Sequence, residues 1–196
     1  MPAAELAAES LKSLNMSPND TILVVVDVQG KLATLMFEHE RLFANIERLI
    51  KIARILDIPI LWTEQAPEKI GATVEPISKL LFPVIKPIAK RSFSCYACGE
   101  FRRHIDGLRR QQVLLAGIEA HVCVYQTARD LRRHGYEVCL AADAVSSRTQ
   151  SNKDIAVERM GREGVVITSV EMAICELLEN ADHPKFREVM ANIKRL

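Results

Sequence analysis

Short apolar runs rich in β-branched residues alternate along this chain with longer segments whose apolar residues have helical spacing. Continuous apolar strands are typical of a parallel sheet that helices cover on both faces. The strands are predicted at 22–26, 58–63, 83–85, 113–116, 137–142 and 164–168, and the main helices at 42–56, 99–108, 121–134, 151–160 and 170–178. The sequence therefore predicts a three-layer α/β/α fold around a central sheet of six parallel strands.

The length of 196 residues fits one domain, because single domains typically have roughly 100–200 residues. Apolar residues make up 48% of the chain, which is enough for a sizeable core. The alanine-rich start is predicted to form a short amphipathic helix at about 1–14, and the tail another at about 184–194. No repeat or Gly/Ser-rich linker interrupts the chain, so we expect residues 1–196 to form a single domain.

The charges nearly balance, with 26 Lys and Arg against 25 Asp and Glu. This balance argues against nucleic acid as the main partner, since phosphate binding needs a basic excess. No apolar run approaches the ~18 residues of a membrane span, and the start lacks the features of a signal peptide. The odd number of five cysteines disfavours a disulfide framework. We therefore expect a cytoplasmic protein with reduced thiols and no membrane partner.

Three reactive side chains follow predicted strands, at the sheet edge where ligands bind in such folds. Asp27 comes directly after the first strand, Lys90 follows the short third strand, and Cys123 lies near a helix start after the fourth. A helix N-terminus favours a thiolate and offers N–H groups to an oxyanion. A carboxylate can take the thiol proton, and a cation can stabilise the ionised pair. The alternative to a reactive site is that Asp27 is a turn carboxylate, Lys90 a surface lysine and Cys123 a buried cysteine that packs the helix on the sheet.

Four ordered motifs give the chain a resemblance to the isochorismatase-like cysteine hydrolase superfamily, over residues 21–169. They are Asp-Val-Gln at 27–29, Lys90 with Ser-Cys-Tyr at 94–96, Gly-Ile-Glu-Ala-His-Val-Cys-Val at 117–124, and Asp-Ala-Val-Ser-Ser at 143–147. The resemblance implies a Rossmann-like, isochorismatase-like hydrolase fold and a homo-oligomer, a dimer or a tetramer. It implies hydrolysis of a small-molecule C–N bond of amide type through a covalent thioester-like intermediate.

The resemblance also implies the roles of individual residues. Cys123 would be the nucleophile, Asp27 the base that takes its proton, and Lys90 the cation that polarises the pair. A cis peptide bond between Ile118 and Glu119 would aim the N–H groups of Glu119 and Cys123 into an oxyanion hole. We further expect three side chains near the strand ends to bind the substrate: Gln29, Phe37 and Trp62. Trp62 could equally belong to the core or to a subunit interface.

The chain departs from two branches of this superfamily. Nicotinamidases carry an Asp-His-His metal site after the second strand, whereas this chain has Trp-Thr-Glu-Gln-Ala-Pro at 62–67 and no histidine through residue 85. We therefore predict no metal and no cofactor. Isochorismatases that cleave a vinyl ether lack the cysteine, so Cys123 argues against that reaction, and ether hydrolysis is kept as an alternative function. A non-catalytic oligomeric scaffold is the other alternative.

Two further features admit a chemical and a structural interpretation. Cys95 and Cys98 form a C-x-x-C motif that could be half of a zinc site with His104 as a third ligand, but no clear fourth ligand is present. His121 could act as a base for Cys123, although a pocket-lining or partly exposed histidine is favoured. Dinucleotide, NTP and serine-hydrolase motifs are absent, so a small molecule is the expected substrate.

Overall fold

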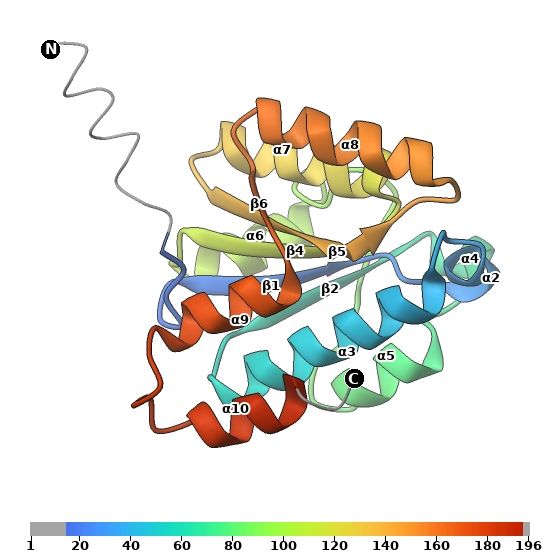
Figure 1. The fold of residues 1–196 in the computed structure, drawn as a ribbon. Coiled ribbons are helices and arrows are strands. Elements are labelled where there is room, and N and C mark those ends of the chain that lie inside the picture. Colours follow the sequence, from blue (N-terminus) through green and yellow to red (C-terminus); the bar gives the residue numbers. More distant parts are fainter. Residues whose placement is uncertain (1–14, 194–196) are drawn as a thin grey trace, which may run out of the picture.

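The computed structural model describes residues 15–193, and its core is one parallel sheet (Figure 1). The strand order is β3-β2-β1-β4-β5-β6, and every pairing is parallel. The strands are β1 (Thr21–Val26), β2 (Ile60–Gln65), β3 (Ile88–Lys90), β4 (Gln112–Ile118), β5 (Glu137–Ser146) and β6 (Val166–Thr168). The six-stranded parallel sheet confirms the fold predicted from the alternation of strand-like and helix-like segments.

Helices cover both faces of the sheet. One face packs against α3 (His39–Ile55), α5 (Glu75–Leu81), α9 (Val170–Leu178) and α10 (Phe186–Ile193). The other packs against α6 (Gly99–Gly107), α7 (Tyr125–Arg133) and α8 (Gln150–Arg162). Three short segments lie near the strand ends, namely α2 (Gly30–Thr34), α4 (Pro67–Ile70) and the π-helical turn η1 (Ala120–Val124). The helix expected at 1–14 lies outside the described residues, and the one expected at 184–194 corresponds to α10.

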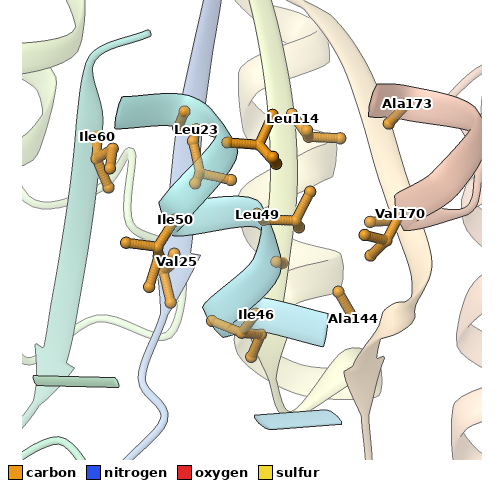
Figure 2. Packing of buried hydrophobic residues seen from close by; sticks show 14 of the residues in the cluster. Leu23, Val25, Ile46, Leu49, Ile50, Ile60, Leu114, Ala144, Val170 and Ala173 are labelled. Atoms are coloured by element: carbon orange, nitrogen blue, oxygen red, sulfur yellow. The ribbon is translucent and has the colours of Figure 1, made fainter. Parts of the chain in front are cut away.

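The two faces of β1 explain why its sequence is apolar without interruption. Side chains of a strand point to opposite faces in turn. Ile22, Val24 and Val26 enter the cluster beneath α6, α7 and α8, while Leu23 and Val25 enter the other. Figure 2 shows Ile46, Leu49 and Ile50 of α3 beside Leu23, Val25 and Leu114 of the sheet. Both faces of β1 are therefore buried, as the hydrophobic effect favours for each of these side chains.

The third strand begins later than the sequence predicts. It is expected at 83–85, but these residues form a turn after α5, in which the Ile85 N–H donates to the Leu81 carbonyl. Val84 is 79% exposed and takes no part in the sheet. The strand begins after Pro87 instead, since proline cannot donate to a sheet ladder and is tolerated next to a strand end. The shift matters because it places Lys90 at the end of β3.

The register aligns the carboxyl ends of the central strands. Val26 pairs with Thr63 on one side and with Gly117 on the other, and Gln65 pairs with Lys90. The residues that follow or close these strands therefore meet at one edge of the sheet, where ligands bind in parallel α/β folds.

None of the helices between residues 15 and 193 has the length and apolar character needed to cross a bilayer.

Candidate active site

A buried ion pair joins the ends of β1 and β3. Lys90 Nζ donates to Asp27 Oδ2 over 2.6 Å, and the two side chains are 0% and 5% exposed. Asp27 adopts a left-handed backbone conformation, with φ of 50°, which turns the chain out of β1. Burial lowers the pKa of Lys90, but electrostatic interaction with Cys95, Asp27 and Cys123 and the hydrogen bond to Asp27 together raise it above its ordinary value. Lys90 is therefore a charged partner inside the protein and not a solvated surface lysine.

The other carboxylate oxygen of Asp27 is held by Thr63, a residue for which the sequence pattern predicts no role. Thr63 Oγ1 donates to Asp27 Oδ1 over 2.7 Å and lies 3.6 Å from the Cys95 sulfur. The backbone N–H of Cys95 donates in turn to Thr127 Oγ1 of α7 over 2.9 Å. Burial raises the pKa of the Cys95 thiol to about 11, so this thiol is neutral at physiological pH. Asp27 thus has fixed partners on both oxygens.

Cys123 lies in η1, just after the end of β4, and lines the same cavity as Asp27. Its pKa is raised above the ordinary value of a thiol by burial, by the charge of Asp27 and by hydrogen bonding to Asp27, while Lys90 acts in the opposite direction. This direction is opposite to the resting thiolate that we expect from the helix start, and its main causes are burial and the neighbouring carboxylate. The resting sulfur carries its proton, next to a carboxylate that can accept it.

The chain between Gly117 and Cys123 contributes Ile118, Glu119, Val122 and Cys123 to the lining of this cavity. The peptide bond between Ile118 and Glu119 is cis, as the resemblance implies. Within residues 15–193, no backbone or side-chain acceptor receives the Glu119 N–H. The Glu119 carboxylate pairs with Arg148 over 2.8 Å. The backbone of Glu119 is therefore available to a ligand, while its side chain is engaged outside the sheet edge.

A cavity of about 160 Å³ opens in front of these groups. Its walls come from strand ends, short helices and loops, and ten residues line it: Asp27, Gln29, Leu32, Gln65, Ile70, Phe93, Ile118, Glu119, Val122 and Cys123. Gln29 is among them, as predicted, but its amide serves the protein backbone. Gln29 Nε2 donates to the Gly71 carbonyl over 2.6 Å, and its Oε1 accepts from the Gln65 N–H over 2.6 Å.

The structure does not bring the other two predicted substrate-binding residues to this cavity. Trp62 precedes Thr63 in β2, so its side chain points to the opposite face of the sheet, where it is 1% exposed and packs edge-to-face on Phe82. Phe37 lies beside the end of β5, where its N–H donates to the Ser147 carbonyl and its own carbonyl accepts from Ser146 Oγ. Trp62 is a core residue, and the backbone of Phe37 is bonded to residues at the end of β5.

The remaining sequence candidates have structural partners. His121 Nδ1 lies 2.9 Å from Ser147 Oγ and does not line the cavity. Cys95 is buried and Cys98 partly exposed, and all five cysteines are free. No group of three or more metal-ligating side chains is gathered anywhere in residues 15–193.

A larger hollow, of about 520 Å³, lies between α7 and α8. Four arginines are among its lining residues, and Cys123 is not.

Sequence reasoning missed Leu32, Phe93 and Val122 in the cavity wall, and it covered Gln65 and Ile70 only within the 64–80 segment that we expect to shape the pocket. Gln65 closes β2, so a consistent use of the strand-end rule would have found it. Leu32 and Ile70 belong to α2 and α4, which are too short to produce a recognisable helical period. Their place in the wall follows from how these helices fold over the sheet edge.

Comparisons with known proteins give this chain a matching family model and similar sequences. The family model described as isochorismatase domain matches residues 21–172. The secreted isochorismatase effector Isc1 of Phytophthora sojae is 37% identical over 97% of this chain and 92% of its own length. The mouse isochorismatase domain-containing protein 2A is 36% identical over 90% of this chain and 84% of its own length.

Solved structures show the same relationship. The structure of MAR1 ribonuclease from Caenorhabditis elegans is 36% identical, with a TM-score of 0.86 and coverage of 91% of each chain. The similarity therefore extends over most of the length of both chains. With a family model that matches most of its length and relatives above one third identity, this chain belongs to the isochorismatase-domain family.

Proposed function

We propose that this protein is a hydrolase that cleaves the C–N bond of a small amide, with Cys123 as its nucleophile. The observation that carries the proposal is that the Lys90-paired carboxylate of Asp27 lines the same cavity as the Cys123 thiol. A thiol, a base and a route for a small ligand are thus combined at one sheet edge. Membership of the isochorismatase-domain family supports hydrolysis as the class of reaction.

In the first half of the reaction, Asp27 accepts the Cys123 proton while the sulfur attacks the amide carbonyl carbon. A neutral resting thiol suits this step, since the proton moves only as the new C–S bond forms. The carbonyl oxygen becomes an oxyanion, which the N–H groups of Glu119 and Cys123 stabilise. One such donor is typically worth about 3–4 kcal/mol of barrier.

The second half releases the product. Asp27 returns its proton to the leaving nitrogen, the C–N bond breaks, and an acyl thioester remains on Cys123. Asp27 then takes a proton from a water molecule, whose oxygen attacks the thioester carbon. The C–S bond breaks and the sulfur regains the proton, so amide and water have become acid and amine. Lys90 and Thr63 keep Asp27 in one orientation through both halves.

The test combines a substrate panel with intact-mass measurement. Wild-type protein is offered small amides, ureides and nitriles. Slow amides and ureides are expected to leave an acyl mass on Cys123, and slow nitriles the mass of the whole nitrile as a thioimidate. Cys123→Ala is expected to lose turnover and adduct while it remains folded, and Cys175→Ser, at an exposed thiol, is the matched control. Failure of the whole panel to acylate wild-type Cys123 would favour the alternative of a non-catalytic scaffold.

Hydrolysis of the vinyl ether of isochorismate is a second candidate, because the Phytophthora relative is named an isochorismatase at 37% identity. That reaction does not need a thiol. Isochorismate is therefore assayed with wild-type protein and with Cys123→Ala. Ether hydrolysis that survives the loss of the thiol would replace the amide proposal.

The ribonuclease name of the Caenorhabditis protein suggests RNA as a further substrate to assay. We favour a small molecule, because the cavity is small and Lys90, the cation beside Asp27, is already paired with that carboxylate. Binding to a phosphate backbone relies on unpaired Lys and Arg side chains. RNA cleavage by wild-type protein that Cys123→Ala abolishes would contradict this choice.

The proposal includes a cytoplasmic homo-oligomer. A thiol nucleophile must stay reduced, and the cytoplasm keeps thiols in that state. Fractionation of cells that produce the protein tests the location. Light scattering coupled to size-exclusion chromatography tests the oligomer, and a mass of a single chain at micromolar concentration would contradict it.

A further inference from the structure

We infer that the cavity in front of Cys123 selects uncharged ligands with a short apolar acyl group and excludes ligands that carry a carboxylate. The inference deepens the proposed function, on which its meaning for catalysis rests. The selectivity itself is a property of the cavity walls and can be measured without turnover. Three observations carry it: the apolar walls, the full use of the nearby cation and the size of the space.

The walls around the reacting groups are mainly hydrocarbon. Leu32, Ile70 and Phe93 come from α2, α4 and the loop after β3, and Ile118 and Val122 come from either side of Glu119. The polar atoms of Gln29 are bound to backbone groups of Gln65 and Gly71. An acyl chain in this space would therefore contact methyl and aromatic groups, which favours apolar over polar substituents.

Lys90 has no hydrogen-bonding capacity left for a ligand. Its ammonium has three protons, and four oxygens already surround it at 3.1 Å or less. These oxygens are Asp27 Oδ2, Gln65 Oε1 and the carbonyls of Ser92 and Phe93. Neither Lys nor Arg is among the described residues that line the cavity, whereas Asp27 and Glu119 are. Because the Glu119 carboxylate pairs with Arg148, Asp27 is the acidic side chain that a ligand in the cavity would meet.

A carboxylate on the ligand would meet two penalties in this cavity. It would lose its hydration without gaining a cationic partner, and it would approach the charge of Asp27. An uncharged amide meets neither penalty, since its carbonyl oxygen has the Glu119 N–H as a partner. Charge alone therefore separates two ligands of the same shape.

The size of the cavity limits the acyl group. Its volume of about 160 Å³ is well below the roughly 300–1,000 Å³ of pockets for drug-sized ligands. A short branched amide such as isovaleramide is a better match to this space than an extended or cyclic dicarboxylate. Isovaleramide and malonamate make a useful pair, because an isopropyl group and a carboxylate are nearly the same shape.

The test uses two alkylating agents that differ mainly in charge. Neutral iodoacetamide and anionic iodoacetate both react with thiolates, so the ratio of their rates at one cysteine does not depend on that cysteine's pKa. Rates are followed by peptide mass spectrometry at Cys123 and at Cys175, an exposed thiol that serves as reference within the same molecule. We expect the neutral-to-anionic ratio at Cys123 to exceed that at Cys175 by about 10-fold or more.

Two lysine substitutions, one in α2 and one just after it, show whether the residues of the cavity wall set the ratio of the two alkylation rates. Leu32→Lys places a cation in the cavity wall and is expected to lower the ratio at Cys123 about fivefold or more. Leu35→Lys adds the same charge three residues away, at a side chain that is 53% exposed and outside the lining, and is expected to leave the ratio unchanged. Equal effects of both variants would contradict a role for the wall.

The outcomes separate this inference from the proposed function. Preference of Cys123 for iodoacetate, or failure of both reagents to reach it, overturns the inference whatever the enzyme hydrolyses. Turnover of malonamate at a rate equal to that of isovaleramide also overturns it and leaves the proposed function intact. A high neutral-to-anionic ratio without amide turnover supports the inference and contradicts the proposed function.

Discussion

The Thr63 hydroxyl donates to Asp27 Oδ1 over 2.7 Å, on the oxygen opposite the one that Lys90 binds over 2.6 Å. Each carboxylate oxygen thus has its own donor, one from β2 and one from β3. Because the sheet register pairs Val26 with Thr63, this contact is built into the ladder between β1 and β2. Thr63 is a positioning residue for the proposed base.

Thr63→Val is expected to lower kcat about 10-fold or more with little change in KM, since a hydrogen bond to a charged group contributes about 1.5–3 kcal/mol. Thr63→Ser restores the hydroxyl and is expected to recover most of the rate. Thr34→Val removes a hydroxyl that bonds the Lys31 carbonyl outside the site and serves as the control. Steady-state kinetics on the best amide of the panel provides the measurement, and a wild-type kcat for Thr63→Val would contradict the role.

Asp27→Asn is expected to abolish turnover and yet speed the alkylation of Cys123. Burial raises the pKa of Cys123, and the charge of Asp27 raises it further, so removal of that charge lowers the pKa and increases the thiolate fraction at a given pH. In the wild type, the iodoacetamide rate at Cys123 should still be increasing at about pH 10, above the ordinary thiol pKa. The alkylation rate at Cys175 in the same samples corrects for differences in the amount of active reagent. Slower alkylation in Asp27→Asn would show that Asp27 activates the resting thiol.

Lys90→Met is expected to destabilise the fold by about 3–5 kcal/mol, because it leaves the carboxylate of Asp27 buried without its cation. The double variant Asp27→Asn with Lys90→Met removes both charges and should recover part of this loss. Lys79→Met breaks the exposed pair with Glu75, at 3.7 Å, and should change the free energy of unfolding by no more than about 0.5 kcal/mol. Denaturant unfolding measures all three. A double variant less stable than Lys90→Met would refute the charge argument.

Gly117→Ala is expected to destabilise the protein by more than about 2 kcal/mol. Gly117 has φ of 122°, and a Cβ there would lie 2.2 Å from the Val26 carbonyl oxygen. That carbonyl belongs to a central strand and cannot move without breaking the ladder. Gly107→Ala, where no atom lies within 4 Å, is the control and should be neutral or slightly stabilising. Comparable melting temperatures for the two variants would contradict the close packing of β4 on β1.

The fold could be predicted from the sequence because its signals are local and repeated. Each β1 residue from Ile22 to Val26 is apolar, which only a strand buried on both faces requires, and helical segments separate the strands. The sequence pattern places the third strand too early because apolar Val84 and Ile85 look like a strand in isolation. Only the turn after α5 shows that their backbone groups are used elsewhere.

The sequence by itself determined the parallel sheet and the three reactive residues at its edge, since strand ends in such a sheet must converge. The tertiary structure decided the protonation of Cys123, the role of Thr63 and the walls of the cavity. Trp62 lies across the sheet from the cavity, and Leu32 and Ile70 lie in its wall, although neither fact has a local sequence signal. These properties depend on burial and on charges from distant strands, and both are set only when the chain has folded.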